Sequence, residues 1–260
     1  MKYSVSIKFM WSALPLPERA RRAAGHGFDR VDLWDWRGED IDGLAAVCRE
    51  TGLEIACIFG HSHSALCDPS QHDLVLEALS ETVAVAERVG ALQLSMFSDA
   101  RGPDGKFLPG PSLTHAQKRR ACVDGLRQCV ALVEGTGMEL TLEAINTVFV
   151  PTYFLADFGA SLEICREVDH PQVRVFFDAY HQQLVGGRLI DNLIDGLPWV
   201  GSVHIADVPG RSEPGTGEIN FHSIRRVLIE HGYDRQLTFE VVPTGDSDAA
   251  VAACKAVFPF

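Results

Sequence analysis

The chain has 260 residues, of which 46% are hydrophobic and 22% are charged, and its formal net charge at pH 7 is −12. This composition excludes a largely disordered, collagen-like or coiled-coil protein, and the length favours a single domain over residues 1–260. A surface this acidic repels phosphate backbones and anionic membrane faces, which disfavours nucleic acids and membranes as partners.

The N-terminal segment and the cysteines bear on the cellular compartment. Lys8 interrupts the first apolar stretch, and Pro15 and Pro17 follow it, which is unlike a signal peptide. No apolar run approaches the roughly 18 residues of a membrane span. None of the seven cysteines forms a C-x-x-C pair, so we expect reduced thiols in a cytoplasmic protein.

Short apolar runs alternate with segments of helical period along the whole chain. Glycines close several of the helical segments, as expected at helix C-termini. In chain order, the expected strands are Val5–Phe9, Arg30–Trp34, Leu53–Phe59, Leu92–Phe97, Glu139–Ile145, Val173–Phe177, Gly201–Ala206 and Leu237–Val242. The expected helices between and after them are Leu16–Gly25, Ile41–Thr51, Leu74–Val89, Thr114–Glu134, Leu162–Val168, Leu189–Leu197, Ser223–His231 and Asp248–Val257.

This alternation predicts an α/β protein with parallel strands and right-handed crossovers. Eight such units favour a single (β/α)8 TIM barrel. The alternative is a six-stranded doubly wound sheet, but no G-x-G-x-x-G or phosphate-loop sequence follows a strand. Two long loops, Asp99–Ser112 and Val208–Asn220, follow strand ends, where a barrel places its active site.

Four ionisable residues lie at or near the ends of the last four expected strands: Glu143, Asp178, His204 and Glu240. In a barrel these strand ends converge, and three converging carboxylates without a cation would repel one another. A divalent ion resolves that conflict, and this donor set suits Mg²⁺, Mn²⁺ or Co²⁺ better than a structural zinc. The alternative is that each residue caps a strand or pairs with a nearby basic side chain.

Three segments resemble the hydroxypyruvate isomerase family. They are Glu143-Ala-Ile-Asn-Thr, Asp178-Ala-Tyr-His-Gln-Gln and the stretch from His204 to Asn220, which contains Val-Pro-Gly-Arg and Glu-Pro-Gly-Thr-Gly-Glu. The family belongs to the xylose-isomerase-like TIM barrels, which also include ketose 3-epimerases and endonuclease IV. The resemblance covers most of the chain and is densest from Glu139 to Val242.

The resemblance implies roles for individual residues. Glu143, Asp178, His204 and Glu240 would be metal ligands, and Glu143 and Glu240 would also be the catalytic acid–base pair. His181 and Arg211 would contact substrate. Such a site could interconvert a 2-ketone and an aldehyde through an enediolate.

Alternative interpretations remain for the substrate-binding candidates. Arg211 could bind a substrate carboxylate through two parallel hydrogen bonds, or could order its loop by pairing with Glu213 or Glu218. His181 could donate to a substrate oxygen, support a neighbouring metal ligand, or face solvent at the start of a helix.

Two further substrate-binding candidates lie near other strand ends. Lys8, inside the expected first strand, could reach the pocket mouth. His61, with His63, follows the expected third strand and could face the pocket or lie in a solvated loop. The aromatic residues near the first two strands could wall the pocket or belong to the core: Phe9, Trp11, Trp34 and Trp36.

The sequence therefore favours a metal-assisted isomerase that interconverts hydroxypyruvate and tartronate semialdehyde, or acts on a close keto acid. The alternative is a ketose 3-epimerase of the same superfamily. An endonuclease IV-like enzyme fits the acidic charge poorly, and a non-catalytic sugar-binding barrel would not need both Glu143 and Glu240. The expected partner is a small keto acid or keto sugar, and a homo-oligomer is left open.

Overall fold

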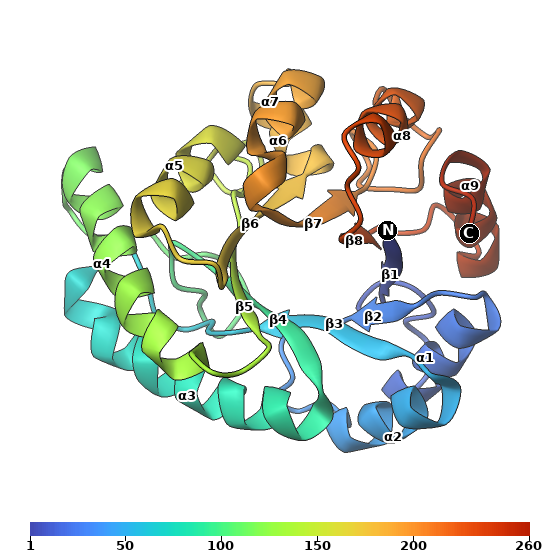
Figure 1. Ribbon diagram of the computed structural model, residues 1–260, viewed down its shortest axis with the longest axis horizontal. Coiled ribbons are helices and arrows are strands. Elements are labelled where there is room, and N and C mark those ends of the chain that lie inside the picture. The colour runs from blue at the N-terminus through green and yellow to red at the C-terminus, as the bar shows by residue number, and fades with distance from the viewer.

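The structure, a computed structural model, describes every residue from Met1 to Phe260. Eight parallel strands follow one another around a closed barrel, and the last pairs with the first (Figure 1). The strands are β1 (Lys2–Ser6), β2 (Arg30–Asp32), β3 (Glu54–Phe59), β4 (Ala91–Met96), β5 (Glu139–Leu142), β6 (Val173–Asp178), β7 (Val200–Ile205) and β8 (Gln236–Phe239). The expected (β/α)8 barrel is confirmed.

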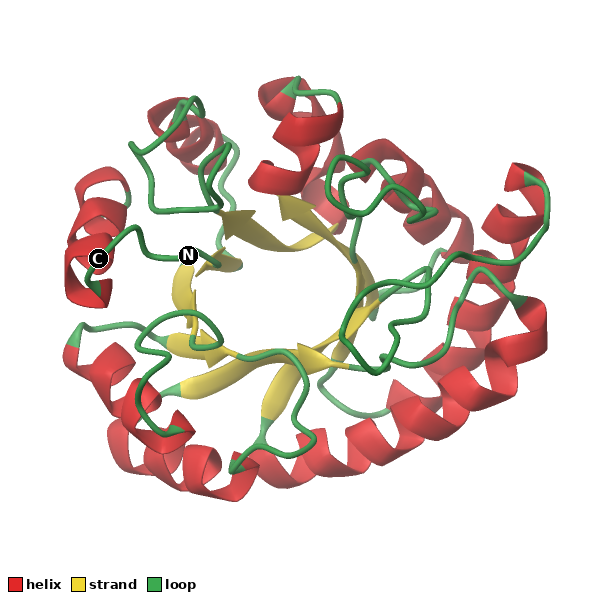
Figure 2. Ribbon diagram, turned by 180° about the vertical axis from the view of Figure 1, so that it is seen from behind, coloured by secondary structure: helices red, strands yellow, loops and turns green.

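Helices cover the outside of the barrel, and loops cross its mouth (Figure 2). The helices are α1 (Leu16–Gly25), α2 (Ile41–Thr51), α3 (His72–Val89), α4 (His115–Val133), α5 (Phe158–Val168), α6 (Ala179–Val185), α7 (Leu189–Gly196), α8 (Phe221–Glu230) and α9 (Ser247–Val257). Gly52 and Gly90 end α2 and α3 with φ of 78° and 76°, a left-handed conformation that glycine adopts without strain.

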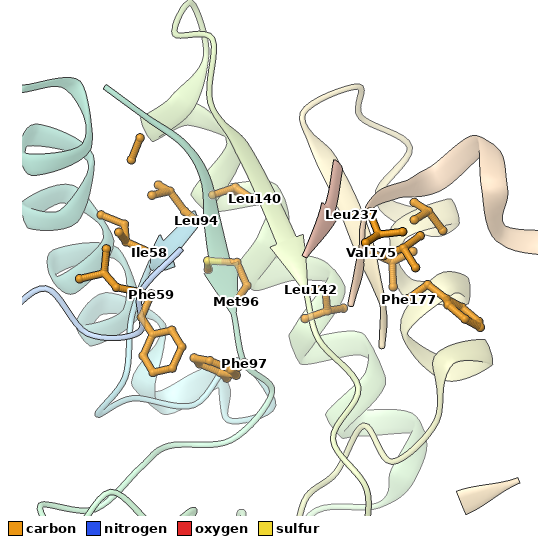
Figure 3. Packing of buried hydrophobic residues seen from close by; sticks show 14 of the residues in the cluster. Ile58, Phe59, Leu94, Met96, Phe97, Leu140, Leu142, Val175, Phe177 and Leu237 are labelled. Carbon is orange, nitrogen blue, oxygen red and sulfur yellow. The ribbon is translucent and has the colours of Figure 1, made fainter. Parts of the chain in front are cut away.

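Side chains alternate between the two faces of the barrel wall. Large apolar residues such as Leu94, Met96, Leu140 and Leu142 are fully buried in one apolar core (Figure 3). The residues between them in sequence point the opposite way, into the barrel. Many of these interior residues are small and polar, and they are buried too: Ser4, Ser6, Ser95, Thr141, Ser202 and Thr238.

The polar interior explains the main error in the expected elements. The first strand is Lys2–Ser6, not Val5–Phe9. Ser4 and Ser6 face inward and are buried, but because they are polar the sequence pattern does not mark this segment as a buried strand. Lys8 therefore lies beyond the strand, in a turn. The short helix α6, directly after β6, was not expected as a separate element.

The two ends of the chain meet beside the barrel. The ring of Phe260 stacks on that of Tyr3, with centroids 4.4 Å apart, and the Lys2 amide donates to the Arg235 carbonyl at 2.8 Å. All seven cysteines are free and buried. No helix has both the length and the apolar character that crossing a bilayer requires.

Candidate active site

The alternation of side chains carries four ionisable residues into the mouth of the barrel. Glu143 follows Thr141 by two residues, His204 follows Ser202, and Glu240 follows Thr238, so each continues the inward-facing row of its strand. Asp178 is the last residue of β6 and lies opposite His204 in the register of β6 and β7.

These residues form one buried group, called here the four-residue cluster: Glu143, Asp178, His204 and Glu240. One potential ligand atom from each lies within 4.8 Å of all the others. None of the four side chains is more than marginally exposed. The strand ends thus bring together the residues that the sequence singled out.

Glu240 is the most firmly held member of the cluster. Its Oε1 accepts a hydrogen bond from Trp34 Nε1 at 2.7 Å, and its Oε2 lies 2.8 Å from Arg211 Nη2 and 3.3 Å from His204 Nδ1. Burial opposes the charged carboxylate, but the Arg211 and His204 charges outweigh it and hold the pKa of Glu240 well below its usual range.

The other cluster members show how strongly the site favours an added positive charge. Burial, together with the negative charge of Glu240, raises the pKa of Glu143 to about 8. Burial alone would lower the pKa of His204, yet the surrounding carboxylates raise it to about 9. His204 Nε2 is buried and has no hydrogen-bond partner. An unpartnered imidazole nitrogen among crowded carboxylates fits a divalent cation.

His181 is buried beside the cluster, not exposed to solvent. The backbone and side-chain amides of Asn146 donate to its Nδ1 at 3.2 and 2.7 Å, so Nε2 carries the proton. That Nε2 lies 3.9 Å from Glu143 Oε1 and 3.8 Å from Asp178 Oδ2. Burial lowers the pKa of His181 to about 4, which keeps the ring neutral and Nε2–H a donor.

Asp178 also begins a helix. Its Oδ1 accepts a hydrogen bond from the His181 backbone amide at 2.9 Å and caps α6. The cap fixes the carboxylate and places His181 one turn away on the same side. The helix therefore positions two residues of the site at once.

Arg211 reaches the site from the loop after β7. Asp207 organises this loop, because its carboxylate accepts from the amides of Val208, Gly215, Gly217 and Ile219. A side chain at position 217 would collide with the Val208 carbonyl, at 1.8 Å from the added Cβ. Arg211 itself has a left-handed backbone, with φ of 56°.

The loop-ordering alternative for Arg211 does not match its contacts. Glu213 accepts from the backbone amide of Thr244 at 3.1 Å, and Glu218 accepts from Gln183. The carboxylate that Arg211 contacts is Glu240.

Three members of the cluster, Glu143, His204 and Glu240, line a cavity of about 520 Å³. Aromatic and apolar side chains make much of its wall: Trp34, Phe59, Phe97, Phe107, Ile145, Phe149, Val150, Phe176 and Tyr180. Trp34 therefore belongs to the wall, whereas Trp11 bonds to Asp248 and is not part of the lining. A cavity of this volume suits a small molecule.

Two of the expected substrate-binding residues lie elsewhere. Lys8 is exposed and does not line the cavity; its Nζ lies 6.0 Å from the Trp34 ring centroid. His61 is fully buried, and both ring nitrogens are used: Nδ1 donates to the Ser64 carbonyl at 3.0 Å, and Nε2 accepts from the Phe97 amide at 3.1 Å. His61 has no free nitrogen to offer a ligand. His63 is exposed and contacts the Arg101 carbonyl.

Three charged residues that line the cavity were not expected from the sequence: Asp32, Arg101 and Lys106. Asp32 ends β2, and burial, with the Glu240 charge adding to it, raises its pKa to about 7. The same strand-end signal would have found it had the strand not been expected to run on to Trp34. Arg101 lies in a long loop, where no sequence pattern marks its direction.

The chain resembles known proteins over nearly its whole length. The family described as xylose isomerase-like TIM barrel matches residues 20–256. A protein of Danio rerio named "Putative hydroxypyruvate isomerase" is 30% identical, over 96% of this chain and 93% of that protein. A 2-oxo-tetronate isomerase of Pectobacterium atrosepticum is 25% identical, over 95% of this chain and 94% of that protein.

Solved structures share the fold at lower identity. An AP endonuclease of family 2 from Brucella melitensis superposes with a TM-score of 0.84 at 22% identity, and 96% of each chain is covered. The 3-keto-D-glucoside 4-epimerase of E. coli superposes with a TM-score of 0.81 at 20% identity, over 100% of both chains. At these identities the likeness concerns the barrel and not the reaction.

Proposed function

Because the chain belongs to the xylose-isomerase-like TIM barrels, we propose that it is a metal-assisted isomerase of a small hydroxy-keto acid. The proposed reaction interconverts hydroxypyruvate and tartronate semialdehyde, or acts on a keto acid one carbon longer. Relatives over nearly the full chain carry names of this reaction type. The observation that carries the proposal is the four-residue cluster, three of whose members line the cavity.

The isomerisation moves one proton between neighbouring carbons. Removing a proton from the hydroxyl-bearing carbon gives an enediolate, and returning a proton to the adjacent carbon forms the new C–H bond. A second proton passes from the former hydroxyl oxygen to the former carbonyl oxygen, so the change needs no added reductant or oxidant. Glu143 and Glu240 are the carboxylates proposed to take and return this proton. Arg211 and Trp34 hold Glu240 in place through their contacts of 2.8 and 2.7 Å.

The remaining polar groups have positioning roles in this scheme. His181 presents Nε2–H to the space beside Glu143 and Asp178, where it would hydrogen-bond a substrate oxygen. Asn146 fixes the tautomer that makes this possible. Trp34, Phe59 and Phe176 give the cavity an apolar wall, which would disfavour water around a reactive enediolate and so limit side reactions.

Glu143, Asp178, His204 and Glu240 would hold a divalent ion such as Mg²⁺, Mn²⁺ or Co²⁺, whose positive charge stabilises the negative charge that develops on adjacent substrate oxygens. The fit rests on this chain's own groups. Three buried carboxylates and the unpartnered His204 Nε2 converge, and burial together with the negative charge of Glu240 raises the pKa of Glu143.

The test is turnover of a matched substrate panel. Protein freed of metal with a chelator is reloaded separately with each of the three ions and assayed by NMR in deuterated water. The panel contains hydroxypyruvate, a four-carbon 3-hydroxy-2-oxo acid, fructose and tagatose. We expect the acids to isomerise with deuterium incorporated at carbon, and chelated protein to be inactive.

Two results would overturn the proposal. Preference for fructose or tagatose over both acids would replace it with the ketose 3-epimerase alternative. Full activity on the acids after verified removal of metal would refute the role assigned to the cluster.

A further inference from the structure

Three basic residues line the cavity, and their contacts differ. Arg211 is paired with Glu240 at 2.8 Å, and the exposed Lys106 lies 3.7 Å from Asp104. Arg101 has no carboxylate oxygen within 4.0 Å. Of the cations in this pocket, Arg101 is therefore the one whose charge no protein carboxylate neutralises directly.

Arg101 is held rigidly although it lies in a loop. Its amide donates to the Ser62 carbonyl at 2.7 Å, and residues 101 and 107 form an antiparallel bridge. Its Nε donates to the Gly105 carbonyl at 2.9 Å, while its two terminal nitrogens make no hydrogen bond within the protein. The Nε end of the guanidinium is thus held by the protein, and the two terminal nitrogens are available to a ligand.

Aromatic rings surround the Arg101 guanidinium. Its central carbon lies 5.2 Å from the ring centroid of Trp34, 5.2 Å from that of Phe59 and 5.6 Å from that of Phe107. Such faces attract a cation but cannot accept its N–H groups in the way that an oxygen does. Burial accordingly lowers the pKa of Arg101, although the more distant charges of Asp35 and Glu143 act in the other direction.

Trp34 connects this guanidinium to the cluster. One indole faces Arg101, and its Nε1 donates to Glu240 Oε1 at 2.7 Å. A small molecule bound to the Arg101 fork therefore lies in the same cavity as the proton-transferring carboxylates.

We propose that Arg101 receives the substrate carboxylate and thereby selects hydroxy-keto acids over neutral ketoses. The inference rests on the proposed function and deepens it by naming the residue that recognises the acid. A planar guanidinium with two free terminal nitrogens can bind a carboxylate through two parallel hydrogen bonds. Arg211, the residue expected from sequence to do this, remains engaged with Glu240 and positions that carboxylate instead.

The experiment compares two substrates of equal carbon number. Hydroxypyruvate carries the carboxylate, and dihydroxyacetone replaces it with a hydroxymethyl group. Arg101→Gln should lower kcat/KM for hydroxypyruvate by about 100-fold or more, because the substrate charge loses its half-buried cationic partner. The value for dihydroxyacetone should change by less than about threefold. Arg101→Lys keeps the charge without the fork and should recover only part of the loss.

The matched control is Arg37→Gln. The Arg37 guanidinium also lies over an indole, 4.5 Å from the Trp36 centroid, but it pairs with Asp35 and Glu81 and does not line the cavity. This variant should leave both kcat/KM values unchanged. Circular dichroism and melting curves establish that every variant is folded.

A second measurement separates this inference from the proposed reaction. Glycerate has a carboxylate and hydroxyl groups but no carbonyl, so it cannot isomerise. Its binding is followed by NMR titration of wild-type protein, Arg101→Gln and Arg37→Gln. Binding lost only in Arg101→Gln supports the inference even if no keto acid is turned over, in which case the proposed function alone fails.

The inference is overturned by either of two results. Wild-type protein could fail to bind glycerate, or Arg101→Gln could bind glycerate and use hydroxypyruvate as wild-type protein does. If keto-acid turnover persists in either case, the proposed function stands and the carboxylate is recognised elsewhere.

Discussion

At Glu240, three donors from three parts of the chain meet on one carboxylate. Trp34 comes from the segment after β2, His204 from β7 and Arg211 from the loop after β7. Glu143, across the cluster, has no comparable set of donors, and its pKa is raised where that of Glu240 is lowered. The neighbours of these two glutamates therefore shift their pKa values in opposite directions.

We expect Glu143→Gln and Glu240→Gln each to reduce turnover by on the order of 100-fold or more while the protein stays folded. An amide of the same shape removes the base but can still coordinate a cation weakly, so metal binding should fall only in part. Steady-state kinetics and metal analysis measure the two effects. Glu218→Gln, which changes an exposed residue outside the cavity, is the control. Near-normal turnover in either variant would leave that residue as a ligand only.

His61 allows a pH prediction away from the cluster. Burial lowers its pKa to about 4, and the neutral ring both donates to Ser64 and accepts from Phe97. The folded pKa is below the unfolded value of about 6.5, so the unfolded chain binds the proton first as pH falls. Stability should therefore be complete above about pH 6.5 and decline toward pH 4, by up to about 3 kcal/mol for this residue.

Urea unfolding at several pH values measures this decline. His61→Gln should be less stable at neutral pH, and its difference from wild-type protein should shrink as pH falls from 6.5 to 4. His222→Gln, at an exposed helix position, should keep the wild-type slope. A constant difference across this range would show that His61 does not titrate as described.

At the scale of elements, the loop after β7 is built around one carboxylate. Asp207 is fully buried and accepts four backbone amides between Val208 and Ile219. Gly217 leaves the space that this arrangement needs. The loop can therefore hold Arg211 against Glu240 without a helix or strand of its own.

Asp207→Asn should disturb this loop selectively. The NH₂ group of the asparagine side chain would face backbone N–H groups that are also donors. Some of the four hydrogen bonds are therefore lost. We expect a lower melting temperature and a kcat/KM reduced by about tenfold or more as Arg211 loses its position. The control is Asp157→Asn, which changes the exposed cap of α5. If Asp207→Asn keeps full activity, Arg211 does not depend on this loop geometry.

The sequence predicted the elements well wherever one face of a helix or strand was strongly apolar. Leu16–Gly25 and Ile41–Thr51 are helices with the expected bounds, and their apolar periodicity and end signals are clear. The first strand was displaced because its inward residues are serines, whose burial depends on the closure of the barrel. Closure of the barrel involves the whole chain and cannot be predicted from a short stretch of sequence.

The candidate site was predictable only in part for a related reason. The convergence of Glu143, Asp178, His204 and Glu240 follows from strand ends meeting at one mouth of the barrel. The partner of Arg211 and the backbone contacts of His61 depend on loop conformations that no periodicity encodes. The same limit hid Arg101, whose surroundings come from three separate loops and strands.

At the scale of the whole molecule, the closed barrel brings several carboxyl groups together at one mouth. The four cluster residues come from four strands, so a cation bound there would connect β5, β6, β7 and the end of β8. Such binding stabilises the folded state over the unfolded chain, in which these residues are far apart.

Divalent ions should therefore raise the melting temperature. At a free concentration one hundred times its dissociation constant, an ion contributes about 2.7 kcal/mol, which corresponds to a shift of several degrees for a chain of this size. Asp178→Asn retains an oxygen to cap α6 but loses the charge, so its shift should be much smaller. Calorimetry with Mn²⁺, against sodium chloride of equal ionic strength, measures both. Equal shifts in both proteins would place the ion elsewhere.

The contact between Phe260 and Tyr3 has a practical consequence for protein engineering. Since β1 and β8 are already paired in the sheet, the polypeptide can be rejoined at its ends and opened at another point without changing any strand order. The exposed connection at residues 103–106 would be a poor place to cut, because it supports Arg101, whereas the turn at residues 135–137 lies at the opposite end of the strands. A circular permutant opened there should fold into the same barrel and keep its catalytic mouth intact.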